Sequence, residues 1–136
     1  MTMSSSVELL RLPTSKAVGL APIFRGLAEK SNGRVTIETL QRDIGRGGMR
    51  VWCVWDGVET LAWVLTSRYE APTGIGVFRI DGIVGRQRKR WLHLMAELLE
   101  AARHEGCSLI ECHARPGWRS EIPHLKHSNN FLEARI

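Results

Sequence analysis

The chain has 136 residues, of which 43% are hydrophobic and 24% are charged. This length and composition are typical of one globular domain that buries its own hydrophobic core, so we expect a single domain over residues 1–136. No apolar run is long enough to span a membrane and the first residues do not resemble a secretion leader, so we expect neither membrane insertion nor secretion.

Net charge and cysteine content narrow the functional class further. The formal net charge of +5 favours an acidic partner, such as a phosphorylated ligand or a nucleic acid. The three cysteines, Cys53, Cys107 and Cys112, are too few and odd in number for a disulfide framework. They predict a reducing compartment, and we expect the protein in the cytoplasm.

The first third of the chain predicts one strand and two helices. Residues 7–12 have the composition of a short strand. Thr14 or Ser15 can cap a helix that runs to about residue 30, and Pro22 should kink or divide it because proline removes a backbone hydrogen bond. Residues 36–43 predict a second, shorter helix that ends at a group of glycines.

The middle of the chain predicts three long strands. Residues 49–55 and 59–69 are rich in β-branched and aromatic side chains, and Asp56-Gly57 between them is a strong hairpin signal. Both faces of the first strand are apolar, so we expect helices on both sides of the sheet. After a break at Pro72, residues 75–84 predict the third strand.

The last third begins with "GRQRKRWLHLM", four cations directly before an apolar pattern of helical spacing that ends at Gly106. Residues 107–114 predict a buried strand. Residues 121–128 predict a short helix after a Ser120 cap, and residues 131–136 predict a final strand. The predicted order is β-α-α-β-β-β-α-β-α-β, an α/β arrangement with hairpins first and a crossover helix later.

This order resembles the GNAT superfamily of acyl-CoA-dependent N-acyltransferases over nearly the whole chain. The segments that carry the resemblance are "VWCVWDGVETLAWVL", "VFRIDGIVGRQRKRWLHLMAELLEAARHEG", "CSLIECHA" and "HLKHSNNFLEARI". The resemblance implies a single-domain GNAT-like fold with a mixed central β-sheet, splayed between its central strands and flanked by helices. It also implies acetyl-CoA as the acyl donor.

In the family, the loop before the main helix holds the coenzyme A pyrophosphate with backbone N–H groups. The family pattern Arg/Gln-x-x-Gly-x-Gly/Ala falls on residues 86–91, where Arg86 fits and Lys89 and Trp91 replace the two small residues. The resemblance implies coenzyme binding by seven residues: Ile83, Val84, Arg86, Arg88, Lys89, Arg90 and Trp91. We expect Trp91→Gly to tighten this binding if the indole occupies the phosphate space, or to weaken a partner if Trp91 belongs to a docking face.

The resemblance also implies catalytic positions. Aligning Asn130-Phe131 with the family's Gly-Phe places Lys126 where a general-acid tyrosine usually stands, and His127 is the neighbouring candidate. Asp81 is the candidate base for the acceptor amine, directly or through water, because a carboxylate in a partly dry cleft has a raised pKa.

Simpler interpretations compete with these. Residues 86–90 can be the solvated start of a helix, although cations there oppose the helix dipole. A nucleic-acid surface ranks third, because interleaved aromatic residues are missing. Cys112 and His113 point to opposite faces of a strand, which disfavours a thiol nucleophile, and His113, His124 and His127 lack the spacing of a metal site.

Two functions remain open. The first is an N-acetyltransferase that moves an acyl group from acyl-CoA to an amine acceptor. The alternative is a catalytically inactive GNAT-fold binding protein that holds a protein partner or an anionic ligand at the basic loop. One predicted terminal strand stands where the family usually has two, so we also expect a homodimer through that exposed sheet edge.

Overall fold

The computed structural model describes residues 6–112, 126–128 and 131–136. The strands lie in one sheet in the order β1-β2-β3-β4-β5-β7-β6. In chain order the elements are β1 (Glu8–Arg11), α1 (Thr14–Ala17), η1 (Val18–Phe24, a 3-10 helix), α2 (Arg25–Glu29), α3 (Ile37–Gly45), β2 (Met49–Trp55), β3 (Thr60–Glu70), β4 (Gly76–Gly85), α4 (Arg88–Trp91), η2 (Leu92–Leu94, a 3-10 helix), α5 (Met95–His104), β5 (Cys107–Cys112), β6 (Lys126–Ser128) and β7 (Phe131–Arg135).

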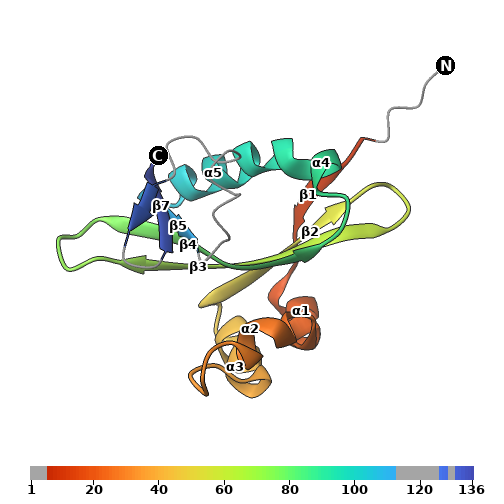
Figure 1. Cartoon of the computed structure of the whole chain (residues 1–136), viewed down its shortest axis with the longest axis horizontal. Coiled ribbons are helices and arrows are strands. Elements are labelled where there is room, and N and C mark those ends of the chain that lie inside the picture. Colours follow the sequence, from red (N-terminus) through yellow and green to blue (C-terminus); the bar gives the residue numbers. More distant parts are fainter. Residues whose placement is uncertain (1–5, 113–125, 129–130) are drawn as a thin grey trace.

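The sheet is mixed, as the α/β prediction requires. β4 and β5 run parallel, joined by the crossover through α4 and α5, whereas all other neighbouring strands are antiparallel. Figure 1 shows α4 and α5 along one face of the sheet and α1, α2 and α3 against the other face. Within the described ranges, no helix combines the length and the apolarity that a membrane crossing needs.

The predicted N-terminal helix is divided, and Pro22 lies inside the dividing segment. The backbone is α-helical in α1, tightens to a 3-10 helix in η1, and returns to an α-helix in α2. A proline lacks the N–H that an α-helical ladder needs, so the tighter segment follows from the sequence. Neither Thr14 nor Ser15 caps this helix, because Pro13 stands at the cap position without a side-chain hydrogen bond.

Local signals set the boundaries of α3 and of the β2–β3 hairpin. Thr36 caps α3 by accepting a hydrogen bond from the Thr39 N–H, and the Thr39 hydroxyl accepts one from the Thr36 N–H. In the hairpin, Oδ1 of Asp56 accepts hydrogen bonds from the N–H groups of Val58 and Glu59 at 2.8 and 2.7 Å. Asp56 therefore holds the turn that the Asp-Gly pair predicts.

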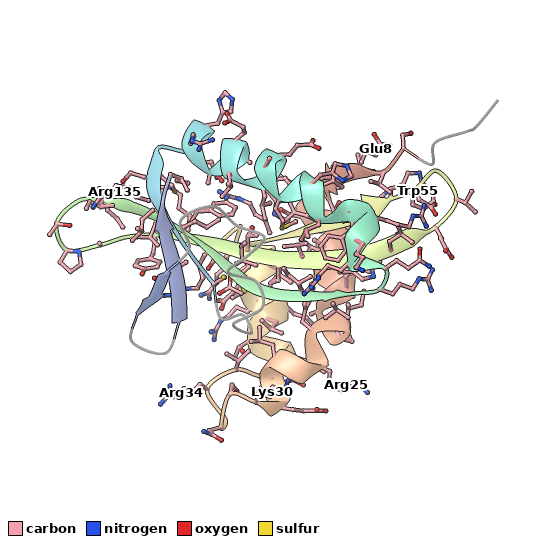
Figure 2. The ribbon with its side chains drawn as sticks, turned by 45° about the horizontal axis from the view of Figure 1, so that its top comes forward. Glu8, Arg25, Lys30, Arg34, Trp55 and Arg135 are labelled. Atoms are coloured by element: carbon pink, nitrogen blue, oxygen red, sulfur yellow. The ribbon has the colours of Figure 1, made fainter. Side chains whose placement is uncertain are left out.

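The core lies on both faces of the sheet, as the apolar pattern of residues 49–55 predicts. Val51 and Leu65 pack with α1, η1 and α3, while Trp52 and Val54 pack beneath α4 and α5. Figure 2 shows side chains filling the space between α5 and the sheet. β2 and β3 are therefore buried between two helical layers and form the packed base of the molecule.

The prediction for residues 121–128 is wrong where the structure describes it. Lys126–Ser128 form the strand β6, which pairs antiparallel with β7, while residues 121–125 lie outside the described residues. Strand pairing with β7 outweighs the local helical signal after Ser120. The expectation of a single terminal strand is wrong for the same reason, since β7 lies beside β5 and β6 follows it at the edge.

Candidate active site

β4 extends further than the part of β5 that the structure describes, which ends at Cys112. The two strands pair in parallel from Gly76, opposite Cys107, to Ile80, opposite Cys112. β4 continues to Gly85 and remains paired with β3 along this length. Among the described residues, the edge of β4 beyond Ile80 therefore has no strand partner on the β5 side, and we call this part of the strand the open edge of β4.

A β-bulge lies at the start of this open edge. Leu65 of β3 pairs with Gly82 and the next residue, Thr66, pairs with Ile80, so that Asp81 is the extra residue on β4. The bulge interrupts the alternation of the strand. Ile80 belongs to the core beneath α5, whereas a Cβ on Gly82 would meet Phe24 of η1 on the opposite face.

Asp81 lies on that same opposite face and is 8% exposed. Burial raises the pKa of its carboxyl from 3.8 to about 6, against the opposing effects of a hydrogen bond with Ser67 and of the Arg79 charge. The Oδ2 atom is buried and has no hydrogen-bond partner in the described structure. A buried acceptor without a donor is costly, so this oxygen is suited to an N–H or O–H group that a ligand brings.

Three further polar residues lie on this face of β3, β4 and β5. The hydroxyl of Tyr69 donates to Oε1 of Glu111 at 2.8 Å, and Nε of Arg79 donates to the same oxygen at 2.8 Å. The Arg79 guanidinium also lies over the Tyr69 ring, 4.7 Å from its centre. We call Tyr69, Arg79 and Glu111 the polar triad.

Sequence analysis does not assign the polar triad to the site. Tyr69 is the last residue of the predicted strand 59–69, and no role is predicted for it. The available signal is the occurrence of Arg79 and Glu111 inside apolar strands, because a charged side chain in a buried strand requires a partner. That signal indicates an ion pair, but it does not identify the two partners.

The basic loop follows β4, and its arginines contact the β2–β3 hairpin. Gln87 adopts the left-handed conformation (φ 55°, ψ 45°) between β4 and α4. Arg86 pairs with Glu59 at 2.7 Å, and Arg90 lies 3.6 Å from Asp56. Both ends of the loop are therefore held by carboxylates of the hairpin turn.

The other predicted coenzyme residues are distributed along β4 and α4. Ile83 is partly buried and packs against the core beneath α5, while Val84 is 43% exposed on the open part of the strand. Arg88 and Lys89 are exposed in α4. These positions place apolar side chains beside the open edge of β4 and cations beyond its end.

Trp91 lies in the core. Its side chain is 2% exposed among the residues beneath α5, and its Nε1–H donates to the Arg86 carbonyl oxygen at 2.8 Å. The interpretation of Trp91 as an exposed docking residue is wrong, because the apolar ring is more stable in the core. The indole fixes the loop from beneath, and its N–H is already used by the backbone.

Lys126 and His127 lie on β6, at the edge of the sheet. β5 and β7 separate β6 from β4, which carries Asp81. The backbone alone is described for these two residues. Their proposed role as proton donors stays a prediction, and their expected position on a short helix is corrected to a strand.

A second surface feature lies away from this site. An open hollow of about 400 Å³ lies between α2 and the start of α3, lined by residues that include Arg25, Val35 and Glu38. Figure 2 shows Arg25, Lys30 and Arg34 at the outer side of this helical layer. Across the described ranges, no group of three or more His, Cys, Asp or Glu side chains is placed to hold a metal ion.

No protein-family model matches the chain, and no curated protein sequence matches it. Solved structures do. An aminoglycoside acetyltransferase from an uncultured soil metagenomic sample, in complex with sisomicin, matches at a TM-score of 0.67 and 13% identity, over 93% of this chain and 94% of that chain.

Two further acetyltransferase structures match over similar lengths. The ribosomal-protein-alanine N-acetyltransferase of Brucella melitensis biovar Abortus 2308 has a TM-score of 0.59 and 16% identity, with 82% of each chain covered. The glucosamine-6-phosphate N-acetyltransferase of Arabidopsis thaliana has a TM-score of 0.56 and 13% identity, over 85% of this chain and 86% of that chain. The chain therefore has the GNAT fold that the sequence predicts.

Proposed function

We propose that the protein is an N-acetyltransferase that moves an acyl group from acyl-CoA to an amine acceptor. The observation that carries the proposal is Asp81, a buried carboxylate at the bulge of β4, whose Oδ2 atom has no hydrogen-bond partner among the described residues and whose pKa is raised to about 6. The GNAT fold supports the reaction class, since the three acetyltransferases described above share it.

The open edge of β4 and the basic loop are where the acyl donor would bind. Backbone groups of residues 82–84 would pair with the pantetheine arm, beside the apolar side chains of Ile83 and Val84. Arg86, Arg88, Lys89 and Arg90 would hold the diphosphate. Bound there, acyl-CoA supplies a thioester whose carbonyl carbon is attacked by the amine nitrogen, with release of the thiol.

The basic loop fits this role although it lacks the family's small residues. Trp91 leaves the phosphate space free because its indole lies in the core. Arg86 and Glu59 are both more than half exposed, and an exposed ion pair contributes only about 0–1 kcal/mol. Arg86 can therefore exchange Glu59 for a phosphate oxygen at little cost in free energy. The cationic side chains would then bind the diphosphate in place of the backbone N–H groups that small residues expose in the family's loop.

Asp81 would act as the base. An amine acceptor arrives mainly as an ammonium ion, and the Asp81 carboxylate can accept its proton because a pKa of about 6 leaves the group ionised and still basic near neutral pH. The amine nitrogen then carries the lone pair that the reaction needs. Lys126 or His127 would supply the proton for the departing thiolate.

The test is product formation from acetyl-CoA and a panel of primary amines, detected by mass spectrometry with wild-type protein and Asp81→Asn. We expect an acetylated product that depends on wild-type protein and falls about 100-fold or more in the variant. Saturable acetyl-CoA binding without turnover of any amine would instead favour the inactive GNAT-fold binding protein. Equal turnover by both proteins would remove Asp81 from the mechanism.

A further inference from the structure

Glu111 is the centre of the polar triad. Its side chain is almost fully buried, and its Oε1 atom accepts hydrogen bonds from Tyr69 of β3 and from Nε of Arg79 of β4, each at 2.8 Å. Nη2 of Arg79 lies 2.8 Å from the same oxygen in an ion pair. A buried carboxylate of this kind is stable only because a cation and hydrogen-bond donors surround it. The guanidinium is further fixed by the Tyr69 ring above it.

Arg79 has a second carboxylate within reach of its charge. Asp81 lies two residues further along β4, on the same face, and both the Arg79 and Glu111 charges act on it. The Arg79 hydrogen bond nevertheless goes to Glu111, and Oδ2 of Asp81 has no hydrogen-bond partner among the described residues. Glu111 therefore competes with Asp81 for the only cation that faces the two acids in the described structure.

We infer that Glu111 is a positioning residue for the acyl transfer: by holding the Arg79 guanidinium toward β5, it keeps Asp81 free of an ion pair and able to accept a proton. The inference rests on the proposed function only in naming Asp81 as the base. Without Glu111, Arg79 would pair with Asp81, and a carboxylate in such a pair is a weaker base because its charged form is stabilised.

The polar and charged groups that face Asp81 determine whether its pKa rises or falls when Glu111 is changed. Ser67 of β3 gives a hydrogen bond, Arg79 of β4 gives a positive charge and Glu111 of β5 gives a negative charge. The packing residues of η1 and α2 beside Gly82 are the apolar Phe24 and Leu27. Removing the Glu111 charge therefore lowers the pKa of Asp81 twice, by loss of the negative charge and by release of Arg79.

The experiment is a titration of the Asp81 carboxyl carbon by NMR, assigned by comparison with Asp81→Asn. We expect a pKa near 6 in the wild type. In Glu111→Gln we expect it to fall by about one pH unit or more, as an ion pair with arginine requires. In Arg79→Gln/Glu111→Gln, where the cation is also absent, we expect it to return to the wild-type value or above.

The double variant also protects the test against misfolding. It removes both charges of the ion pair together, so that no buried charge is left without its partner at this position. If Glu111→Gln alone fails to fold, a double variant with an Asp81 pKa well below that of the wild type would overturn the inference. An unchanged Asp81 pKa in a folded Glu111→Gln would also overturn it.

The acid limb of the kcat/KM profile gives a second readout, and it should move to lower pH in Glu111→Gln with the plateau reduced. Tyr69→Phe is the matched control, since it removes one hydrogen bond from Glu111 but leaves both charges, so its limb should stay in place. If no amine is acetylated at all, the proposed function fails. The NMR titration of Asp81 still shows whether Arg79 pairs with Asp81 when the Glu111 charge is removed.

Discussion

At the scale of single residues, the raised pKa of Asp81 suits its proposed role as a base but lowers the stability of the folded protein near neutral pH. Because folding raises the pKa of its carboxyl from 3.8 to about 6, the folded protein binds this proton more tightly than the unfolded chain does. The stabilisation is complete below pH 3.8 and is lost as the pH rises through about 6. Above that value the ionised carboxylate costs about 3 kcal/mol relative to a neutral group.

We therefore predict that Asp81→Asn is more stable than the wild type at pH 8, by up to about 3 kcal/mol, and equally stable at pH 3.5. Urea unfolding at the two pH values measures this difference. Asp43→Asn on α3, where the carboxylate is exposed, is the control and should change little at either pH. A destabilised Asp81→Asn at pH 8 would contradict the account of this site.

Trp91 gives a second prediction at this scale. Since its side chain lies in the core, Trp91→Ala should lose about 3–5 kcal/mol of unfolding free energy. Trp91→Phe should lose less, mainly the hydrogen bond to the Arg86 carbonyl, about 1 kcal/mol. Thermal or urea unfolding separates the two values. Trp91→Gly is thus a test of folding, and it does not report on coenzyme binding.

The account of Trp91 is contradicted if its replacement by alanine leaves the free energy of unfolding unchanged. If Trp91→Ala unfolds at the same urea concentration as the wild type, the indole does not lie beneath the loop. Trp55→Ala provides the comparison, because Trp55 lies at the end of the hairpin with part of its side chain exposed and should lose less.

At the scale of elements, the backbones of β3 and β4 lie unusually close together at the last residue of β4. Gly85 pairs with Ala62, and a Cβ on Gly85 would lie 2.4 Å from the Ala62 Cβ and 2.8 Å from the Leu61 carbonyl oxygen. The backbones must therefore separate to accept any side chain at this position. The glycine before the basic loop is a packing requirement of the strand pair.

We predict that Gly85→Ala destabilises the protein by about 1–3 kcal/mol, as overpacked sites do. Gly26→Ala is the matched control. It lies in α2, its added Cβ would meet nothing within 4 Å, and it should stabilise the helix by about 0.5–1 kcal/mol. Equal stability of the two variants in urea would show that β3 and β4 do not approach this closely.

The elements differ in how far the sequence predicts them. Pro22 and the Asp56-Gly57 turn act locally, so the divided helix and the hairpin follow from a few residues. β6 does not, because pairing of Lys126–Ser128 with β7 is a contact that helical spacing cannot reveal. The bulge at Asp81 is similarly absent from the pattern, since it depends on the register against β3.

The same limit applies to the candidate site. The resemblance predicts Asp81 and the basic loop, since each belongs to one continuous segment. Glu111 lies 42 residues from Tyr69 and 32 from Arg79, so no local spacing joins the polar triad. Sequence analysis names Asp81 as the candidate base but does not identify the residues that act on its pKa.

At the scale of the whole molecule, two helical layers hold β2 and β3, while β4 extends beyond the described part of β5. Figure 1 shows this arrangement, with α5 above the sheet and α1 to α3 below it. β2 and β3 form the buried base, and the far end of β4 carries Asp81, the basic loop and the edge that has no strand partner among the described residues. A catalytic site is held most precisely by a packed scaffold, so this arrangement is consistent with the proposed function.

The homodimer stays a prediction at this scale, but the strand at the sheet edge differs from the one that the sequence predicts. The sheet ends in the three-residue strand β6, where a longer single terminal strand was expected. A sheet edge still offers backbone groups to a second copy. Light scattering at micromolar concentration should give the mass of a dimer, and a monomer would contradict the prediction.

The most direct test of the central claim is isothermal titration with acetyl-CoA at pH 7.5. We predict saturable binding at one site, weakened about tenfold or more when Arg86, Arg88 and Lys89 are changed together to glutamine, because three charges then leave the diphosphate. The same number of changes at Arg25, Lys30 and Arg34, on the far helical layer, should leave the affinity unchanged. Absence of heat and of any thermal shift at millimolar acetyl-CoA would contradict the acyltransferase function.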